Sequence, residues 1–472
     1  MNDPAPIINR FFGGLVCVLM ALGGVSCGPG PLEDDWVTQR PLANTDPTYR
    51  PPSLRSIEPD WSGSPNDAPA TDDVVTLHDV VRLALQHSPK LRDRGWHVRG
   101  QEASTLQASL SPNPLLRYSI ENLDGPEGGD LFVRQTVRVS QVLEIGGKRT
   151  KRVQLARAEQ RLAAWDFEAT RIQVATDAAK RFIDAIVARQ YVEHADRTLG
   201  LAEQTYQIVQ QRVNAGIVPR VELDKAKVRV SSERVFANRT RSQLRTAYQK
   251  LAAVWGGLDV SFSKVEGDLE TMVRIPEESG LIPLLAANPR IAKKRDELDV
   301  CRKAWDLAKA NSIPNVTVGA GVRHFPDARD VAGVVDLAIP LPISDRRQGD
   351  MLKARYRFMQ TQAALANEQS MLRSNLTAAY DQLIAAEFEI RTLLDEALPA
   401  ARSAFGAAKD SFTQGRTDYL TVLDAERTLT TVERQLIDAR GVYHSAVADI
   451  EQITATPIDH GDRSASDESV SP

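Results

Sequence analysis

The sequence SPKLRDRGWHVRGQEASTLQA occupies residues 88–108, and NPRIAKKRDELDVCRKAWDLAKA occupies residues 288–310, about 200 residues later. The offset persists further along the chain. Leu143-Glu144-Ile145 is matched by Leu341-Pro342-Ile343, and Asn214-Ala215-Gly216 is matched by Thr413-Gln414-Gly415. Landmarks that keep their register over such a distance indicate two copies of one supersecondary unit, so the duplication decides the fold.

The composition of the 472 residues excludes several partners and sites. With 58 basic and 62 acidic residues, the chain has no dominant charge that would indicate nucleic acid or an anionic membrane surface as a partner. Duplicated units that bury their faces against each other are expected to form one architecture. Cys301 is the only cysteine expected in the mature body, which predicts neither a disulfide framework nor a thiolate metal cluster.

The first 27 residues have the pattern of an export signal. Arg10 precedes an uncharged run over residues 11–25, which is short for a membrane span and ends in small residues. The small residues before Cys27 resemble the lipobox of bacterial lipoproteins, which implies that Cys27 is lipidated. The alternative is an ordinary cleaved signal in which Cys27 is incidental. Gly28, rather than Asp, follows the cysteine, and by the sorting pattern of such lipoproteins this implies the outer membrane.

Beyond residue 27 the chain divides into an arm, two repeats, a linker and a tail. The expected ranges are an extended arm over 28–73, a first repeat over 74–256, a linker over 257–280, a second repeat over 281–455 and a disordered tail over 456–472. The first repeat begins with a helix capped by Thr76 and broken at Ser88-Pro89.

Each repeat then contains two runs typical of strands. Alternating apolar and polar residues predict strands over about 115–122, 131–143, 315–324 and 331–343. No run of about 18 apolar residues follows the signal, so a membrane crossing would have to use these strands. Their length suits a tilted transmembrane strand. Open strand edges are costly in lipid, so four strands in a membrane would require partner strands from other copies of the chain.

A long helix and a returning helix follow each pair of strands. The expected ranges are 149–213 and 219–255 in the first repeat, and 347–413 and 417–453 in the second. Apolar residues at alternating steps of three and four predict coiled-coil packing, as in Leu376, Leu383 and Ile390. At the reversals, Pro219 is expected in the first turn of its helix and Thr417 as an N-cap, and Pro399 should kink the second outgoing helix.

Residue patterns of catalysis are absent from the sequence. Gly146-Gly147-Lys148-Arg149-Thr150 has Val142 where a phosphate loop needs its first glycine, so this segment predicts a helix start. The seven histidines include no pair spaced four apart and none near a cysteine, so no metal site is expected. The sequence therefore predicts a protein that is not an enzyme and holds no cofactor.

The element order and three local segments resemble the TolC family of outer-membrane efflux ducts over residues 74–455. The segments are SQVLEIGGKR at 140–149, AIPLPISDR at 338–346 and VLDAERTL at 422–429. The first is similar to the CzcC branch of heavy-metal efflux lipoproteins, although ducts that serve drugs share parts of these segments. The resemblance implies a mainly α fold with a small β part. It also implies a homotrimer in which each chain gives four strands to a twelve-stranded barrel and its helices to a coiled-coil cylinder.

The resemblance also implies residues at the helical tips that narrow the pore. Glu222 and Asp424 match positions of acidic aperture rings, and the alternative is that they are ordinary solvated charges. Thr421 stands where a second Asp is usual, and Phe412 replaces a gating Tyr whose hydroxyl bond it cannot form. The residues implied to dock an adaptor are Gly216, Ile217, Val218, Gly415, Arg416 and Thr417.

The leading hypothesis is a passive exit duct in outer-membrane lipid, serving a resistance-nodulation-division (RND) pump and a periplasmic adaptor that export divalent heavy metals. The alternatives are a drug-efflux or type I secretion outlet of the same fold, or a lipid-anchored periplasmic coiled-coil scaffold. Pro219 in one tip and Thr417-Asp418 in the other break the equivalence of the repeats. This difference predicts that one pair of helices moves on opening while the other stays.

Overall fold

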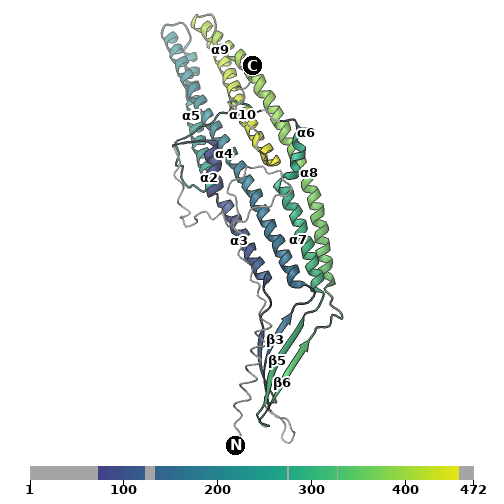
Figure 1. Ribbon diagram of the computed structural model, residues 1–472. Helices are drawn as coiled ribbons and strands as arrows, with labels where there is room; N and C mark the ends of the chain where they lie inside the picture. Colours follow the sequence, from purple (N-terminus) through teal and green to yellow (C-terminus); the bar gives the residue numbers. More distant parts are fainter. Residues whose placement is uncertain (1–72, 123–132, 274–275, 327, 457–472) are drawn as a thin grey trace, which may run out of the picture.

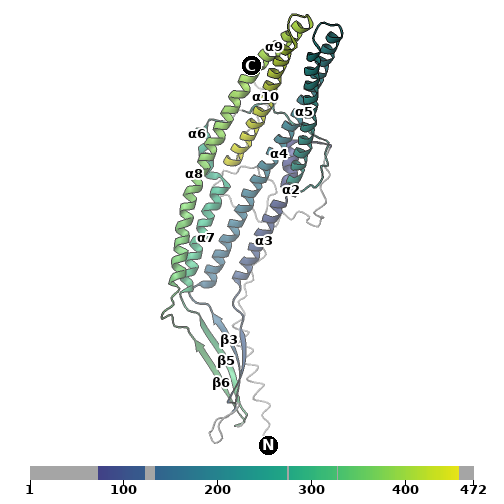
Figure 2. The ribbon, with the colours of Figure 1, turned by 180° about the vertical axis from the view of Figure 1, so that it is seen from behind.

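The computed structural model describes residues 73–122, 133–273, 276–326 and 328–456. Cys27, the signal segment, the arm up to residue 72 and the tail from residue 457 lie outside the described residues. Long helices run side by side along most of the molecule, and the strands form a separate layer at one end (Figure 1). Seen from behind, both helical reversals lie together at the opposite end (Figure 2). Among the described residues, no helix is both long and apolar enough to cross a membrane.

Two short helices and a small sheet open the described part. The side chain of Thr76 caps α2 (Leu77–His87), as expected from the sequence, and the structure adds a reciprocal capping box with Asp79. Ser88 separates α2 from α3 (Pro89–Ser109), and Pro89 is the first residue of α3. Strand β1 (Val74–Val75) pairs in parallel with β4 (Lys264–Val265), so the linker adds a strand beside the start of the first repeat.

The main sheet has four antiparallel strands in the order β2-β3-β5-β6. They are β2 (Leu115–Glu121), β3 (Arg134–Leu143), β5 (Val316–Phe325) and β6 (Asp330–Ala338). The expected strand over 331–343 was too long, because β6 ends at Ala338. Pro340 and Pro342 follow, and neither has a backbone N–H to donate to a neighbouring strand. For the strand expected over 131–143, Val133 precedes β3 and residues 131–132 lie outside the described part.

One face of this sheet is apolar and open to its surroundings. Leu116, Val139, Ala320 and Val335 form one row across the four strands, because directly paired residues share a face. Val335 is 87% exposed and Leu116 is 68% exposed. The opposite face carries Arg117, Arg138 and Asp336. The outer strands β2 and β6 each pair with only one neighbour in the described chain, so both edges of the sheet are open.

The first repeat contains the longest helix. Helix α4 (Lys148–Asn214) has 67 residues, which corresponds to about 100 Å at 1.5 Å per residue. It returns as α5 (Arg220–Ala252), followed by a 3-10 turn over Ala253–Trp255. The expected ranges were 149–213 and 219–255. Gly146 and Gly147 both have positive φ and lead directly into α4, so the glycine-rich segment is a helix start.

The second repeat has the same design with one interruption. Helix α6 (Glu278–Leu281) joins the linker to the second repeat, which continues with a 3-10 segment (Ile282–Ala287) and α7 (Pro289–Asn311). The expected single helix over 347–413 is divided into α8 (Gln348–Thr392), a π-helical turn (Leu393–Ala397) and α9 (Leu398–Thr413). Pro399 explains the interruption, since its ring would collide with the carbonyl four residues earlier in a regular helix. Helix α10 (Tyr419–Thr454) returns from the tip.

The core lies in three apolar clusters along the rod. One cluster packs α2, α4 and the end of α5 around Phe182, Ile186 and Trp255, and the linker residue Val265 closes it. The second contains Leu376, Leu383 and Ile390, which are at most 2% exposed, so the predicted heptad seam is confirmed over α8. Its expected continuation through Ala400, Ala404 and Ala407 was wrong, because these residues are exposed and the buried stripe of α9 shifts to Leu398, Ala401 and Ala408. A third cluster lies at the tips around Phe412, Tyr419 and Val422.

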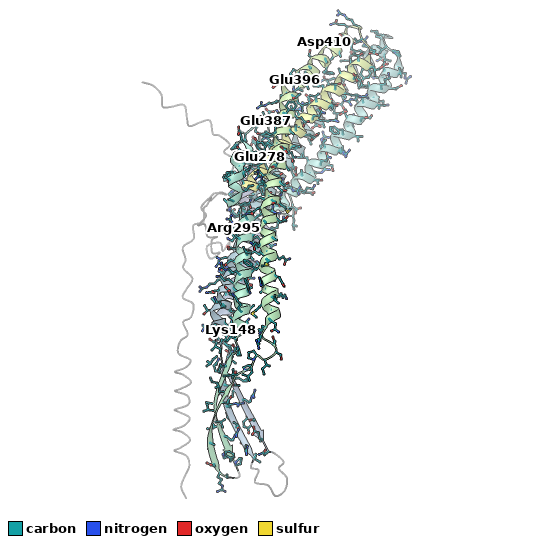
Figure 3. The ribbon with its side chains drawn as sticks, turned by 90° about the vertical axis from the view of Figure 1, so that its right-hand side faces the viewer. Lys148, Glu278, Arg295, Glu387, Glu396 and Asp410 are labelled. Atoms are coloured by element: carbon teal, nitrogen blue, oxygen red, sulfur yellow. The ribbon has the colours of Figure 1, made fainter. Side chains whose placement is uncertain are left out.

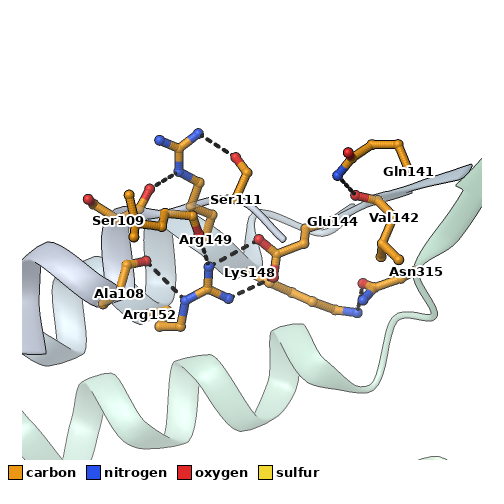
Figure 4. A network of polar contacts seen from close by, with 11 residues as sticks. Ala108, Ser109, Ser111, Gln141, Val142, Glu144, Lys148, Arg149, Arg152 and Asn315 are labelled. Carbon is orange, nitrogen blue, oxygen red and sulfur yellow. Dashed lines mark hydrogen bonds and ion pairs between the residues drawn. The ribbon is translucent and has the colours of Figure 1, made fainter. Parts of the chain in front are cut away.

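A polar network fixes the junction between the sheet and the long helices (Figure 4). Arg152 on α4 binds both carboxylate oxygens of Glu144, at 2.6 and 3.1 Å, and its Nε donates to the Ala108 carbonyl at the end of α3. Lys148 donates to the Asn315 side chain, which ties the first repeat to the second. The hydrogen bond from Arg152 holds the pKa of Glu144 below its ordinary value, whereas burial lowers the pKa of Lys148. We call the set Glu144, Lys148, Arg152 and Asn315 the junction network.

Candidate functional site: the helical tips

The two helical reversals are built in the same way. Gly216 has a φ of +69° and Gly415 has a φ of +77°, a region that glycine enters without strain. At the first tip, Gly216 N–H donates to the Val213 carbonyl and Ile217 N–H to the Arg212 carbonyl. At the second tip the equivalent bonds run from Gly415 to Phe412 and from Arg416 to Ser411. Both turns are therefore complete Schellman motifs, and the duplication extends to their hydrogen bonds.

The returning helices begin differently at the two tips. Pro219 is the N-cap residue of α5 and does not lie in its first turn, because helical geometry begins only at Arg220. In the second tip the expected cap Thr417 was wrong. Asp418 caps α10 by accepting the Thr421 N–H at 3.1 Å, whereas the hydroxyl of Thr417 is buried without a partner among the described residues. A carboxylate one residue later forms a charge-assisted cap and displaces the hydroxyl.

The residues expected to dock an adaptor lie at the end of the molecule. Ile217 is 63% exposed, Val218 is half-buried, and Gly216 is exposed at the first tip. At the second tip Gly415 and Arg416 are exposed and Thr417 is half-buried. The structure therefore presents an apolar pair on one tip and a cation on the other.

The four aperture candidates occupy three different environments. Phe412 is buried, with its ring 6.0 Å from that of Tyr419 and the Arg212 guanidinium 4.4 Å from its centroid. Thr421 is held by Asp418, to which its hydroxyl also donates at 2.6 Å. Asp424 is exposed on α10.

Glu222, the fourth candidate, is largely buried on α5. One of its oxygens pairs with Lys225 at 3.2 Å, and the other is buried without a partner in the described chain. Further acidic side chains follow the second outgoing helix toward its tip, where Figure 3 labels Glu387, Glu396 and Asp410. Of these, Glu396 and Asp410 are exposed.

A buried charge cluster below the tips was not anticipated from the sequence. Arg229 on α5 donates through two nitrogens to Oε1 of Glu426 on α10, at 3.1 and 3.0 Å, and pairs with Glu233 at 2.7 Å. Glu426 is fully buried, and its second oxygen has no partner within the described residues. Burial raises the pKa of Glu426, with Arg229 opposing this shift. We call Arg229, Glu233 and Glu426 the tip charge cluster.

A sequence signal for this cluster existed. Glu426 and Glu433 lie seven residues apart, in register with Tyr419, so both occupy successive seam positions of the α10 heptad. A charged residue at a seam position is costly unless it finds a partner on the facing helix. The partner of Glu426 is 197 residues distant in the sequence, which is why periodicity alone did not identify it.

Further polar contacts join the two repeats along α4 and α10. His194 Nδ1 lies 3.2 Å from Glu433, and this contact lowers the pKa of Glu433. Tyr191 donates to Asp438 at 2.7 Å, and Lys180 pairs with Asp449 at 2.6 Å. Nearest the tip, Arg212 donates to the Phe412 carbonyl. These contacts, together with the Arg229–Glu426 pair, form what we call the inter-repeat ladder.

The polar groups of the tips contact neighbouring helices. Among the described residues, no cluster of three His, Cys, Asp or Glu side chains is placed to hold a metal ion. Cys301 is buried, with its sulfur 3.3 Å from the Thr361 hydroxyl.

Comparison with known proteins identifies this architecture. The family model described as "Outer membrane efflux protein" matches residues 80–257 and 283–456, one match for each repeat. The chain belongs to the outer membrane efflux protein family. The expected TolC-like fold class, internal duplication and outer-membrane location are thereby confirmed. The family consists of efflux channels rather than enzymes.

Individual members of the efflux protein family resemble the chain over most of their length. It is 29% identical over 385 residues to the cobalt-zinc-cadmium resistance protein CzcC of Cupriavidus metallidurans, covering 80% of this chain and 90% of that protein. It is 23% identical over 416 residues to the outer membrane protein TolC of Vibrio cholerae, with coverage of 80% and 90%. The crystal structure of the outer membrane protein VceC from Vibrio cholerae superposes with a TM-score of 0.69 at 20% identity, covering 81% and 97%.

Proposed function

We propose that this efflux channel is the passive exit duct of a tripartite system that exports divalent heavy-metal cations. In this proposal three copies of the chain form a barrel of twelve strands in the outer membrane. The observation that carries it is the sheet, in which one apolar face is exposed and both edge strands lack a partner. A four-stranded sheet in lipid would leave backbone groups without hydrogen bonds, and closure with other copies removes those edges.

The helices supply the periplasmic part of the proposed duct. With its length of about 100 Å, α4 projects the tips far from the sheet, where Ile217, Val218 and Arg416 would contact a periplasmic adaptor. An inner-membrane pump of the resistance-nodulation-division class would supply the energy, since the chain is proposed to be passive. Lipidation at Cys27 would add a membrane anchor.

Glu222 and Asp424 are proposed as aperture residues. Each is repeated three times in the trimer, so a carboxylate that faces the pore becomes a ring of three negative charges. Opening would separate the helix pair α9–α10 from α4–α5 along the inter-repeat ladder. The polar character of the ladder supports this, because water can replace polar contacts at a lower cost than it can cover an apolar seam.

The substrate class rests on the likeness to the cobalt-zinc-cadmium resistance protein. Deleting the gene and restoring it in the same strain should lower and then recover tolerance to zinc, cobalt and cadmium. Tolerance to drugs in the same strains is the comparison. If deletion leaves metal tolerance unchanged and reduces drug tolerance, the substrates are drugs and not metals.

The duct itself is tested by labelling and conductance. Cysteine introduced at Val137 should react with a probe confined to lipid, and cysteine at Arg138 with a water-soluble probe, because neighbouring residues of a strand face opposite sides. Purified protein should be trimeric in detergent and should conduct ions in a planar bilayer. A monomer without conductance, labelled by the aqueous probe at both positions, would instead favour a periplasmic scaffold.

A further inference from the structure

The polar face of the main sheet carries a group of arginines at mid-strand. Arg117 on β2 is directly opposite Arg138 on β3, and Arg323 on β5 is directly opposite Thr136 in the next row on the same face. All three lie away from the hairpin ends of their strands by at least two residues. We call Arg117, Arg138 and Arg323 the arginine belt.

In the described strands, one acidic residue pairs with the belt, from the row next to that of Arg138. Asp336 on β6 lies opposite Gly319 and pairs with Arg138 at 3.1 Å. Among the described residues, Arg117 and Arg323 have no carboxylate partner. Nearer the hairpins, Glu121 is directly opposite Arg134, so that row is balanced. Asp330 lies at the first position of β6, where its carboxylate accepts the N–H of Val331.

Two glycines make room for the belt on β5. A Cβ atom on Gly319 would collide with the Asp336 carboxylate, and one on Gly321 would lie 2.8 Å from the Arg138 Cα. Because both positions lack a side chain, Arg138 can cross β5 from β3 and reach Asp336 on β6. Arg323 is held in a similar way, since its Nε donates to the buried Thr136 hydroxyl at 3.1 Å. Arg138 and Arg323 are thus held against the sheet by specific contacts.

The position of the belt decides what it contacts. The other face of the same strands presents Val335, Leu116 and Tyr118, which are exposed and apolar, so that face is the one suited to lipid. The belt must then face the water-filled interior of the barrel. In a trimer, each uncompensated arginine is repeated three times around one pore, and fixed charges in a low-dielectric wall concentrate ions of opposite sign.

We propose that the arginine belt makes the outer-membrane segment of the duct selective for small anions over cations. This inference rests on the proposed function, because it requires a closed barrel. The positive charge of the arginine belt is opposite in sign to that of the proposed carboxylate rings at Glu222 and Asp424. The duct would therefore carry negative charge at its periplasmic entrance and positive charge at its exit. Divalent cations outside the cell would meet this positive segment first when no pump is driving export.

Reversal potentials measured in planar bilayers across a KCl gradient test the proposal. In the double variant Arg117→Gln with Arg323→Gln, the permeability ratio of potassium to chloride should rise several-fold relative to the unaltered channel. Arg138 is left in place, since its removal would leave Asp336 unpaired. The matched control Arg117→Lys with Arg323→Lys keeps the charge and should keep the ratio.

A third variant gives a change of opposite sign. Asp336→Asn removes the carboxylate that pairs with Arg138, so the same ratio should fall. If the variant Arg117→Gln with Arg323→Gln conducts with the same permeability ratio as the unaltered channel, the inference is wrong. The proposed function as a duct would still stand. Absence of any conductance from the unaltered protein would overturn the proposed function, and this inference with it.

Discussion

The two polar networks at opposite ends of the rod differ in how completely their charges are paired. In the junction network, both oxygens of Glu144 are bound by Arg152, and its pKa is lowered. In the tip charge cluster, Arg229 is shared between two carboxylates, one oxygen of Glu426 is unpaired in the described chain, and the pKa of Glu426 is raised. The carboxylate is fully paired in the junction network, whereas the tip charge cluster has more negative than positive charge.

This difference indicates different mechanical roles. A fully paired carboxylate stabilises the fold at neutral pH, so the junction network should hold the helices rigidly on the sheet. A buried carboxylate with an unsatisfied oxygen costs free energy in the closed arrangement and would regain hydration if the helices separated. The tip is therefore expected to lie closer to opening than the junction, which agrees with the proposed gate at the tips.

The largest effect is expected from Arg229→Met. The substitution keeps most of the apolar stem but leaves Glu233 and Glu426 buried without a cation, which costs about 3–5 kcal/mol for a buried pair. Helices α5 and α10 should separate near the tips. Hydrogen exchange of their amides should accelerate, and bilayer conductance should rise toward the open level.

Arg234→Met is the matched control for this substitution. Arg234 lies on the same helix and pairs with Glu203 at 3.3 Å, but both side chains are about half exposed or more. An exposed pair contributes about 0–1 kcal/mol. Equal changes in the two variants would show that the tip charge cluster has no special role.

A smaller and different effect is expected from Glu144→Gln. Loss of charge-assisted bonds to Arg152 should cost about 1.5–3 kcal/mol, and it should appear as a lower unfolding temperature of the assembled protein. The closed conductance should stay unchanged, because the junction lies at the other end of the rod. Asp184→Asn, which alters an exposed pair with Arg181 on the same helix, provides the control. A rise in conductance with Glu144→Gln would contradict the division of roles.

Much of the fold could be predicted because its signals are local. The heptad pattern and the glycine turns set α4 to within one residue at each end, and the capping residue Thr76 could be identified from its neighbours. The end of β6 was missed, although Pro340 and Pro342 were visible in the sequence. Pro399 was expected to interrupt the second outgoing helix, but the form of the interruption, a π-helical turn, was not predicted.

The candidate site was less predictable because its contacts are distant in sequence. Arg229 and Glu426, His194 and Glu433, and Arg138 and Asp336 are each separated by about 200 residues or more. The members of each pair meet only because the two repeats pack side by side in the folded chain. Phe412 was interpreted through the hydroxyl it lacks, whereas in the structure its ring and carbonyl both contact Arg212.

The smallest effect is expected from a change of pH, since this adds one proton to Glu426 and removes no side chain. The pKa of Glu426 is raised above 4.5 in the folded tip, so folded protein takes up this proton before unfolded protein does as the pH falls from neutrality. Mild acid should therefore stabilise the closed tip and lower the conductance. Tyr419, whose pKa burial raises to about 12, stays neutral throughout.

The pKa of Glu144 is shifted below 4.5, so the junction should weaken only as the pH falls below that value. Glu426→Gln should remove the conductance change in mild acid but preserve the loss of thermal stability at lower pH. A conductance response retained in that variant would assign the proton to another group and separate the tip charge cluster from the pH response.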